Sequence, residues 1–356
     1  MNLKIRKLID HFPELGVEAV LLTSPYNRRY ISGFTGSSAF LYISKQRRIL
    51  LTDFRYILQA TAQCPDFEVV DYKKLGLLEN LEQFLKADSV QSFGFEGDLM
   101  TYGEYQLFTG KLSSVEWKSI GNVVEKIRMI KTPEELVLLR RASQIGDEAF
   151  THMLNFIQVG MTEKEIALEL EYTMRKLGAE AMSFEPIIAS GINGALPHAR
   201  PSDKKIQKGE LLTMDFGCIY QGYCSDMTRT VAIGEVNDKL KEIYDIVLKA
   251  HLVSLEALKP GMTCSAADTI ARDIIAEAGY GEYFGHSLGH SVGLEVHEKP
   301  TLSQNDHSIL LENMMATIEP GIYIPEVGGV RIEDLAVLTA TGAESLVTSE
   351  KKLIVL

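Results

Sequence analysis

Asp215 and Asp226 are the first residues whose types and spacing suggest chemistry. They lie in two adjoining stretches rich in apolar and β-branched residues, and the pair Gln221-Gly222 between these stretches is typical of a hairpin turn. With the turn centred between Tyr220 and Gln221, Asp215 lies directly opposite Asp226, about 5 Å away at Cβ. Because like charges opposed in this way destabilise a sheet, we expect a cation to neutralise them.

A second acidic pair, Glu319 and Glu333, lies in a similar hairpin whose loop is centred near Glu326. Either pair alone is also compatible with a solvated sheet edge or a salt bridge, and a one-residue shift in register would separate its members. Two such pairs in one chain favour a metal site. Oxygen ligands of this kind suit magnesium, calcium or manganese.

A glycine-rich stretch between the two hairpins offers nitrogen ligands. Residues 285–300 contain His286, His290 and His297, and glycines in such a stretch let the backbone approach a ligand closely. A surface loop with incidental histidines is the alternative interpretation. A histidine ligand would exclude calcium and favour manganese, cobalt, iron or zinc. The HExxH zinc motif, the P-loop and the Gly-x-Ser-x-Gly elbow are absent from the sequence.

The C-terminal region that must position these side chains contains two similar halves. Residues 160–162 and 261–263 both read Gly-Met-Thr and precede an expected helix, and residues 198–201 and 297–300 both begin with His and end with Pro. We interpret these matches as a duplicated unit of two helices and a hairpin, with a pseudo-twofold axis through the site. Two unrelated helix starts are the alternative.

The N-terminal region reads as a separate α/β domain. Strands are predicted at 17–22, 39–43 and 48–52, and helices at 76–86 and 101–112. Thr132, Pro133 and Glu135 then form the signature of a helix start. The sequence therefore predicts an α/β (α+β) protein with domains at 1–127 and 128–356.

Composition narrows the class of protein. The 356 residues are 46% hydrophobic and 24% charged, as in soluble globular proteins, and this length predicts two domains. A net charge of -12 argues against a nucleic-acid surface. No apolar run approaches the roughly 18 residues of a membrane span, and no signal-peptide core begins the chain. With four scattered cysteines, we expect a cytoplasmic protein that binds neither nucleic acid nor membrane.

The ordered set Asp215, Asp226, His290, Glu319 and Glu333 resembles the five-ligand signature of the pita-bread metallopeptidases, which include methionine aminopeptidase, aminopeptidase P and prolidase. Flanking strings such as Met-Asp-Phe-Gly, Ser-Asp-Met-Thr-Arg-Thr and Ile-Glu-Pro-Gly match that pattern in order. Segments 27–34 and 52–56 are similar to the N-terminal creatinase/prolidase-like domain of the proline-directed branch. The resemblance thus implies this domain followed by a pita-bread fold. Creatinase itself lacks the metal ligands and fits poorly.

The resemblance also implies two divalent metal ions, with Mn²⁺ expected and Co²⁺, Zn²⁺ or Fe²⁺ as alternatives. Asp226 and Glu333 would bridge the ions, Asp215 would complete one, and His290 with Glu319 the other. A water between the ions would be acidified to attack the peptide carbonyl, and Glu319 would accept its proton.

By the same resemblance, five further side chains are expected at the substrate: His198, His286, His297, Tyr323 and Arg331. His297 and His198 would hydrogen-bond the scissile carbonyl as charge develops on it. Arg331 reads equally well as part of an ion pair. Thr228 would support a metal ligand.

Cleavage before proline is implied by the resemblance alone. An Xaa-Pro aminopeptidase acting on short proline-containing peptides is the main expectation. The alternative is a prolidase restricted to Xaa-Pro dipeptides, which would need a group that captures the C-terminal carboxylate. A non-catalytic binding protein is disfavoured because all five ligands are present. A homodimer is expected, with Tyr30, Phe34 and Arg55 narrowing the entrance of a neighbouring active site.

Overall fold

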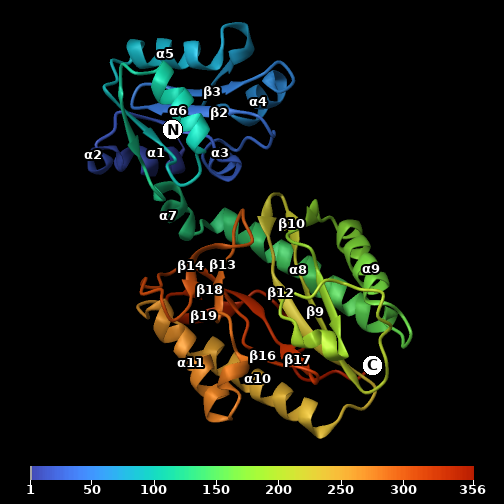
Figure 1. Cartoon of the computed structure of the whole chain (residues 1–356). Coiled ribbons are helices and arrows are strands. Elements are labelled where there is room, and N and C mark those ends of the chain that lie inside the picture. The colour runs from blue at the N-terminus through green and yellow to red at the C-terminus, as the bar shows by residue number, and fades with distance from the viewer. Residues whose placement is uncertain (1) are drawn as a thin grey trace. The chain divides into compact units, whose positions relative to one another are not determined.

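The computed structural model describes residues 2–356 and divides the chain into two compact units, one ending at Arg128 and one beginning at Met129 (Figure 1). Each unit has a hydrophobic core of its own. Within the described residues, no helix combines the length and the apolar composition that crossing a membrane requires.

The N-terminal unit is built on one six-stranded sheet with strand order β4-β3-β2-β1-β5-β6. Its elements are α1 (Leu3–Asp10), α2 (Phe12–Leu15), β1 (Ala19–Leu22), α3 (Pro25–Ser32), β2 (Phe40–Ser44), β3 (Arg48–Thr52), α4 (Ile57–Gln63), β4 (Glu68–Asp71), α5 (Leu77–Ala87), β5 (Ser92–Phe95), α6 (Tyr102–Lys111), β6 (Glu116–Ser119) and α7 (Val123–Met129), which crosses the boundary. Strands β1 to β3 pair antiparallel, whereas β3–β4, β1–β5 and β5–β6 are parallel. The predicted strands and helices are confirmed to within two residues at their ends.

Two aromatic residues that were expected to narrow the entrance of a neighbouring subunit's active site belong instead to the core of the N-terminal unit. Tyr30 and Phe34 are only 4% and 2% exposed. Their burial contradicts the prediction that they narrow a neighbouring active site. Arg55 is exposed and pairs with Asp53 at 2.8 Å.

The C-terminal unit holds short sheets between two pairs of helices (Figure 1). Its elements are α8 (Pro133–Phe156), α9 (Glu163–Lys176), β7 (Ala181–Met182), β8 (Ile187–Ser190), η2 (Gly191–Ala195), β9 (Glu210–Phe216), β10 (Cys218–Tyr220), β11 (Tyr223–Cys224), β12 (Met227–Ile233), α10 (Asp238–Ala257), α11 (Cys264–Glu277), β13 (Gly289–Ser291), β14 (Glu298–Leu302), β15 (Met315–Ile318), β16 (Gly321–Ile324), β17 (Gly328–Arg331), β18 (Asp334–Thr339) and β19 (Gly342–Ser345). Helices α8 and α9 contact β8, β10 and β11, and α10 and α11 contact β14 to β17 and β19. The helix predicted after Thr132 is α8, and both bonds of its capping box are present.

The two halves of this unit repeat the same local structure around α9 and α11. In each half the threonine of the Gly-Met-Thr segment caps the helix. Gly160 and Gly261 both have left-handed backbone, with φ of 94° and 90°, a conformation that favours glycine. Their N–H groups donate to the carbonyls of Ile206 and Leu310. Equivalent contacts in equivalent places support a duplicated unit over two unrelated helix starts.

The first acidic hairpin has a register different from the predicted one. Gln221 and Gly222 form a two-residue turn in which both residues have positive φ, as in the type I′ geometry favoured by sheet twist. The turn centre therefore lies one residue later than predicted, and Asp215 lies opposite Thr228. The predicted pairing of Asp215 with Asp226 is wrong by two residues. Because side chains alternate with a period of two, both aspartates still share one face.

The second acidic hairpin has the predicted register. The pairs of β15 with β18 and of β16 with β17 follow one continuous alignment, which places Glu319 opposite Glu333. Glu326 lies at the apex with φ of 64°. The predicted loop centre is therefore confirmed.

Candidate metal centre and active site

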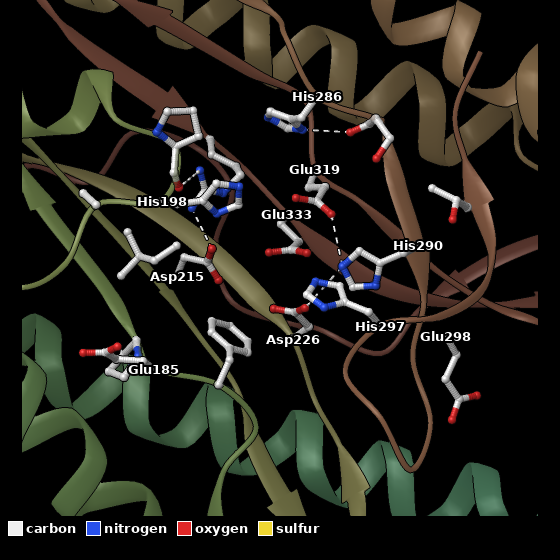
Figure 2. A pocket seen from close by; sticks show the side chains of 18 of the residues that line it. Glu185, His198, Asp215, Asp226, His286, His290, His297, Glu298, Glu319 and Glu333 are labelled. Carbon is white, nitrogen blue, oxygen red and sulfur yellow. Dashed lines mark hydrogen bonds and ion pairs between the residues drawn. The ribbon is translucent and has the colours of Figure 1, made fainter. Parts of the chain in front are cut away.

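Five potential metal ligands converge on one cavity of about 630 Å³ in the C-terminal unit. They come from separate elements: Asp215 from β9, His290 from β13, and Asp226, Glu319 and Glu333 from positions adjoining β12, β15 and β18. Figure 2 shows these side chains turned toward a common centre. The two hairpins and the glycine-rich stretch thus meet as the sequence predicts.

The donor atoms lie close enough to share cations. One atom from each of Asp226, His290 and Glu333 lies within 4.8 Å of the others. The Nε2 atom of His290 is 3.4 Å from Glu319 Oε1 and 3.7 Å from Asp226 Oδ2. Among residues 2–356, the buried Oδ1 atom of Asp215 has no hydrogen-bond partner. Four carboxylates and one imidazole therefore suit divalent ions that accept both oxygen and nitrogen.

Electrostatics also indicate that this cluster needs cations. Burial, and then the charges of Glu333 and Asp215, raise the pKa of Asp226 well above its usual range. Burial and the charge of Glu319 do the same for the pKa of Glu333. For Glu319, burial outweighs the opposing charge of Arg331 and raises the pKa to about 7. Without metal, burial and mutual repulsion favour the protonated forms of these carboxyls, and bound divalent ions would displace the protons.

Arg331 lies within the cluster as its buried ion-pair partner. Its Nη2 donates to Asp215 Oδ2 at 2.6 Å, its Nη1 to the Tyr323 hydroxyl at 2.8 Å and its Nε to Thr228 Oγ1 at 3.1 Å. Thr228 in turn donates to Glu333 Oε2 at 2.7 Å. The guanidinium is thus committed to protein partners, which favours the ion-pair interpretation of Arg331 over substrate binding. Thr228 supports Glu333, as expected.

His290 is held in one orientation by its neighbours. Its Nδ1 is 3.1 Å from the Ser291 carbonyl, so Nδ1–H donates there and Nε2 faces the carboxylates with its lone pair free. Thr317 accepts from the His290 backbone N–H at 2.9 Å and donates to Glu319 Oε1 at 3.0 Å. Sequence reasoning missed Thr317. Its position two residues before Glu319, on the same strand face, is the signal that could have found it.

His286 and Tyr323 form a pair with fixed hydrogen-bond direction. Because Arg331 donates to the Tyr323 oxygen, the hydroxyl donates to His286 Nε2 at 2.8 Å, and His286 Nδ1–H donates to the Ser287 carbonyl at 2.8 Å. Burial lowers the pKa of His286 to about 4, so the ring is neutral. His286 lines the cavity with a ring whose nitrogens are both engaged. Tyr323 is not among the residues that line the cavity, and its hydroxyl is engaged by His286 and Arg331, so its contact with substrate stays a prediction.

His198 and His297 line the same cavity. The rings of His297 and His290 are 4.4 Å apart between centroids. Burial and the neighbouring His290 and His198 lower the pKa of His297, which favours a neutral ring able to donate one hydrogen bond. Apolar residues also line the cavity, namely Phe184, Pro186, Ile187, Pro197 and Ala199, none of which the sequence analysis singles out.

Residues 137–340 match the metallopeptidase family M24, and residues 4–130 match the creatinase/prolidase N-terminal domain. The chain belongs to metallopeptidase family M24. It is 42% identical to a Xaa-Pro dipeptidase of Pyrococcus horikoshii, with 99% of each chain covered. Two similar solved structures are a Xaa-Pro dipeptidase from Bacillus anthracis (47% identity, TM-score 0.96) and an X-Pro aminopeptidase from Thermotoga maritima (39% identity, TM-score 0.92), each with 99% of both chains covered.

These relatives confirm the predicted family, its proline-directed branch and the two-part fold of this M24 metallopeptidase. The protein is a metal-dependent peptidase. The order of the two predicted activities needs correction. Similar proteins named dipeptidases favour the prolidase alternative over the aminopeptidase that the sequence placed first.

We expect divalent metal to stabilise this M24 peptidase more at about pH 8 than at about pH 5.5. Because burial raises the pKa of Glu319 from 4.5 to about 7, the metal-free native state binds a proton that the unfolded state releases in this window. Stability of the metal-free protein therefore falls as pH rises through that window, and bound metal removes the loss. Thermal unfolding with chelator or Mn²⁺ measures this. At a free Mn²⁺ concentration of 100 times Kd, binding adds about 2.7 kcal/mol to the free energy of unfolding, which corresponds to an increase of about 5–10 °C in Tm. A Tm gain independent of pH would contradict the expectation.

Proposed function

We propose that the protein is a prolidase, a dipeptidase that hydrolyses the peptide bond of Xaa-Pro dipeptides with two divalent metal ions, Mn²⁺ being expected. The observation that carries the proposal is the convergence of four carboxylates and His290 in one cavity that also has an apolar wall. Relatives that are 42% and 47% identical over almost the whole chain are named Xaa-Pro dipeptidases, which supports the same activity.

The metal ligands are proposed as the sequence predicted. Asp215, Asp226, His290, Glu319 and Glu333 would together hold the two ions. Bound ions supply Lewis acidity that brings the pKa of a water close to neutral. We therefore propose residues 128–356, which carry these ligands, as the catalytic domain and residues 1–127 as the accessory domain.

Proton transfer and charge stabilisation then fall to protein side chains. Glu319 takes the proton of the attacking water, since its carboxylate faces the centre of the cluster (Figure 2). His297 and His198 donate hydrogen bonds to the carbonyl oxygen as negative charge develops on it. Both histidines line the cavity that holds the ligands.

The apolar wall provides a place for the proline ring. Phe184, Pro186 and Ile187 line the cavity together with the His286 ring, whose nitrogens are both engaged. The amide before proline has no N–H, so the site needs no backbone acceptor for it. A neutral, largely apolar surface fits such a substrate.

Capture of the C-terminal carboxylate is what distinguishes a dipeptidase. Lys299 and Arg200 line the cavity and are exposed, whereas Arg331 is committed to Asp215. Arg200 already lies 3.6 Å from Glu185. We therefore assign the carboxylate to Lys299.

Lys299→Met should lower kcat/KM for Ala-Pro about tenfold, because it removes one exposed charge-assisted hydrogen bond. Hydrolysis of Ala-Pro-NH2, which has no carboxylate, should change less than about twofold. The Arg200→Met variant is the matched control, because its charge is already paired, and it should retain most of the activity. Equal losses on both substrates would contradict the assignment of Lys299.

An Xaa-Pro aminopeptidase remains the second candidate. The relative from Thermotoga maritima carries that name at 39% identity, and a cavity of about 630 Å³ leaves room for more than a dipeptide. Mn²⁺-reconstituted protein should be tested side by side on Ala-Pro, Ala-Pro-Ala and Ala-Ala-Ala. Cleavage of Ala-Pro alone supports the prolidase, and cleavage of Ala-Pro-Ala supports the aminopeptidase. Cleavage of Ala-Ala-Ala alone would overturn both.

We also propose that the enzyme acts in the cytoplasm as a homodimer on short proline-containing peptides. All four cysteines are buried as free thiols, which suits a reducing compartment. Light scattering of the purified chain tests the dimer.

A further inference from the structure

Glu163 is the first residue of α9 and is fully buried. Its Oε1 accepts hydrogen bonds from the backbone N–H and the hydroxyl of Ser190, at 2.7 and 2.8 Å. Its Oε2 accepts from the N–H and the hydroxyl of Ser202, at 3.1 and 2.6 Å. The side-chain amide of Asn193 donates to both oxygens at 3.1 Å. The single carboxylate of Glu163 thus accepts hydrogen bonds from Ser190, Asn193 and Ser202.

The donors to Glu163 come from Ser190, Asn193 and Ser202, so all of them belong to the segment 190–202, and Ser190 and Ser202 are its two end residues. This segment carries His198 into the cavity. Ser190 is the last residue of β8 and pairs with Leu212 of β9. After Ser190 the segment contains the short helix η2 but is otherwise irregular, so ladder hydrogen bonds do not define its shape there. None of the hydrogen bonds found within residues 2–356 fixes the His198 ring, so the position of that ring depends on its backbone. That backbone has a second anchor, because Arg331 Nη1 donates to the carbonyl of the neighbouring Pro197 at 3.3 Å.

A buried carboxylate with several donors is a strong anchor. Burial opposes its ionisation, but the hydrogen bonds from Ser202 and Ser190 outweigh burial and hold the pKa of Glu163 below its usual value. Charge-assisted bonds of this kind are about twice as strong as neutral ones. A glutamine would replace one acceptor oxygen by an N–H donor facing other donors. The substitution therefore removes bonds while it keeps the volume.

We propose that Glu163 is a positioning residue that holds the segment 190–202 so that His198 faces the reacting carbonyl. The inference rests on the proposed function, in which His198 donates a hydrogen bond to that carbonyl oxygen. Glu163 itself is not among the residues that line the cavity, so it acts through the segment and not on the substrate.

Glu163→Gln should lower kcat for Ala-Pro about tenfold and change KM less than about twofold, because a small misplacement of a catalytic group slows the chemical step. Glu165→Gln is the matched control. Glu165 is exposed in the same helical turn, and its carboxylate accepts hydrogen bonds from Thr162. Hydrogen exchange of the Ser190 and Ser202 amides should accelerate in Glu163→Gln and stay unchanged in Glu165→Gln.

A double-mutant cycle with His198→Ala tests the route of the effect. If Glu163 acts through His198, adding Glu163→Gln to His198→Ala should change kcat less than about twofold. A full tenfold loss in the His198→Ala background would overturn the inference, as would unchanged kcat in Glu163→Gln. If Glu163→Gln does not fold, Glu163→Asp keeps the charge one methylene shorter and replaces it in the same cycle.

The two proposals fail in distinguishable ways. Metal-loaded wild type that cleaves neither Ala-Pro nor Ala-Pro-Ala would overturn the proposed function and the role of His198 with it. Active wild type together with an unaffected Glu163→Gln variant would overturn the positioning role alone.

Discussion

Asp226→Asn should lower kcat/KM for Ala-Pro by at least about 1000-fold, equivalent to about 4 kcal/mol of transition-state stabilisation. Asp226 belongs with His290 and Glu333 to a group of potential ligands in which one atom of each lies within 4.8 Å of the others. Asparagine keeps the shape but removes one of the negative charges that would hold the divalent ions. Steady-state kinetics and metal content by mass spectrometry measure the loss.

The same variant should be more stable than wild type when both are metal-free. Burial and the neighbouring carboxylates raise the pKa of Asp226, so the ionised form is disfavoured in the native state. An amide is neutral without taking up a proton on folding, so the substitution should raise Tm by a few degrees, about 1 kcal/mol in stability. Glu185→Gln is the control, because Glu185 lines the cavity but is exposed at its edge. A D226N variant that kept its metal and its activity would place the metal centre elsewhere.

The hairpins show how far local sequence determines the site. The register of the Glu319 hairpin was predictable, because its loop places Glu326 at the apex. The register of the other hairpin depends on whether Gln221 adopts positive φ, which glutamine seldom does, so the turn centre was placed one residue early. The prediction that Asp215 and Asp226 share a metal site does not depend on this error, because a register shift of two residues leaves both side chains on the same face of the sheet.

Contacts between residues far apart in the sequence could not be predicted from local sequence patterns. Arg331 reaches Asp215, 116 positions away, and the sequence could not decide between this ion pair and substrate binding. Tyr323 has the same strand parity as Glu319, but the fold engages its hydroxyl with His286 and Arg331, which the local sequence does not predict. Glu163 reads as an ordinary acid at a helix start, and only the fold brings residues 190 and 202 to it.

Arg331→Met should lower the free energy of unfolding of the metal-free protein by about 3–5 kcal/mol, the usual effect of removing one partner of a buried ion pair. Arg331 is 3% exposed and donates to Asp215, Tyr323 and Thr228, so methionine leaves three buried polar groups without their donor. Arg331→Lys should be intermediate, because a lysine keeps the charge but lacks the planar fork that reaches all three partners.

Bound metal should reduce the effect of Arg331→Met, because divalent ions compensate the carboxylate of Asp215. Urea unfolding followed by circular dichroism, with chelator and with Mn²⁺, tests this. Tryptophan fluorescence would not serve, since the single tryptophan, Trp117, lies in the N-terminal unit.

Arg140→Met is the matched control. Arg140 makes a two-pronged but exposed pair with Glu344 at 2.7 and 2.9 Å, for which about 1 kcal/mol or less is expected. If the two variants lost equal stability without metal, Arg331 would not be the cation that balances the acidic cluster.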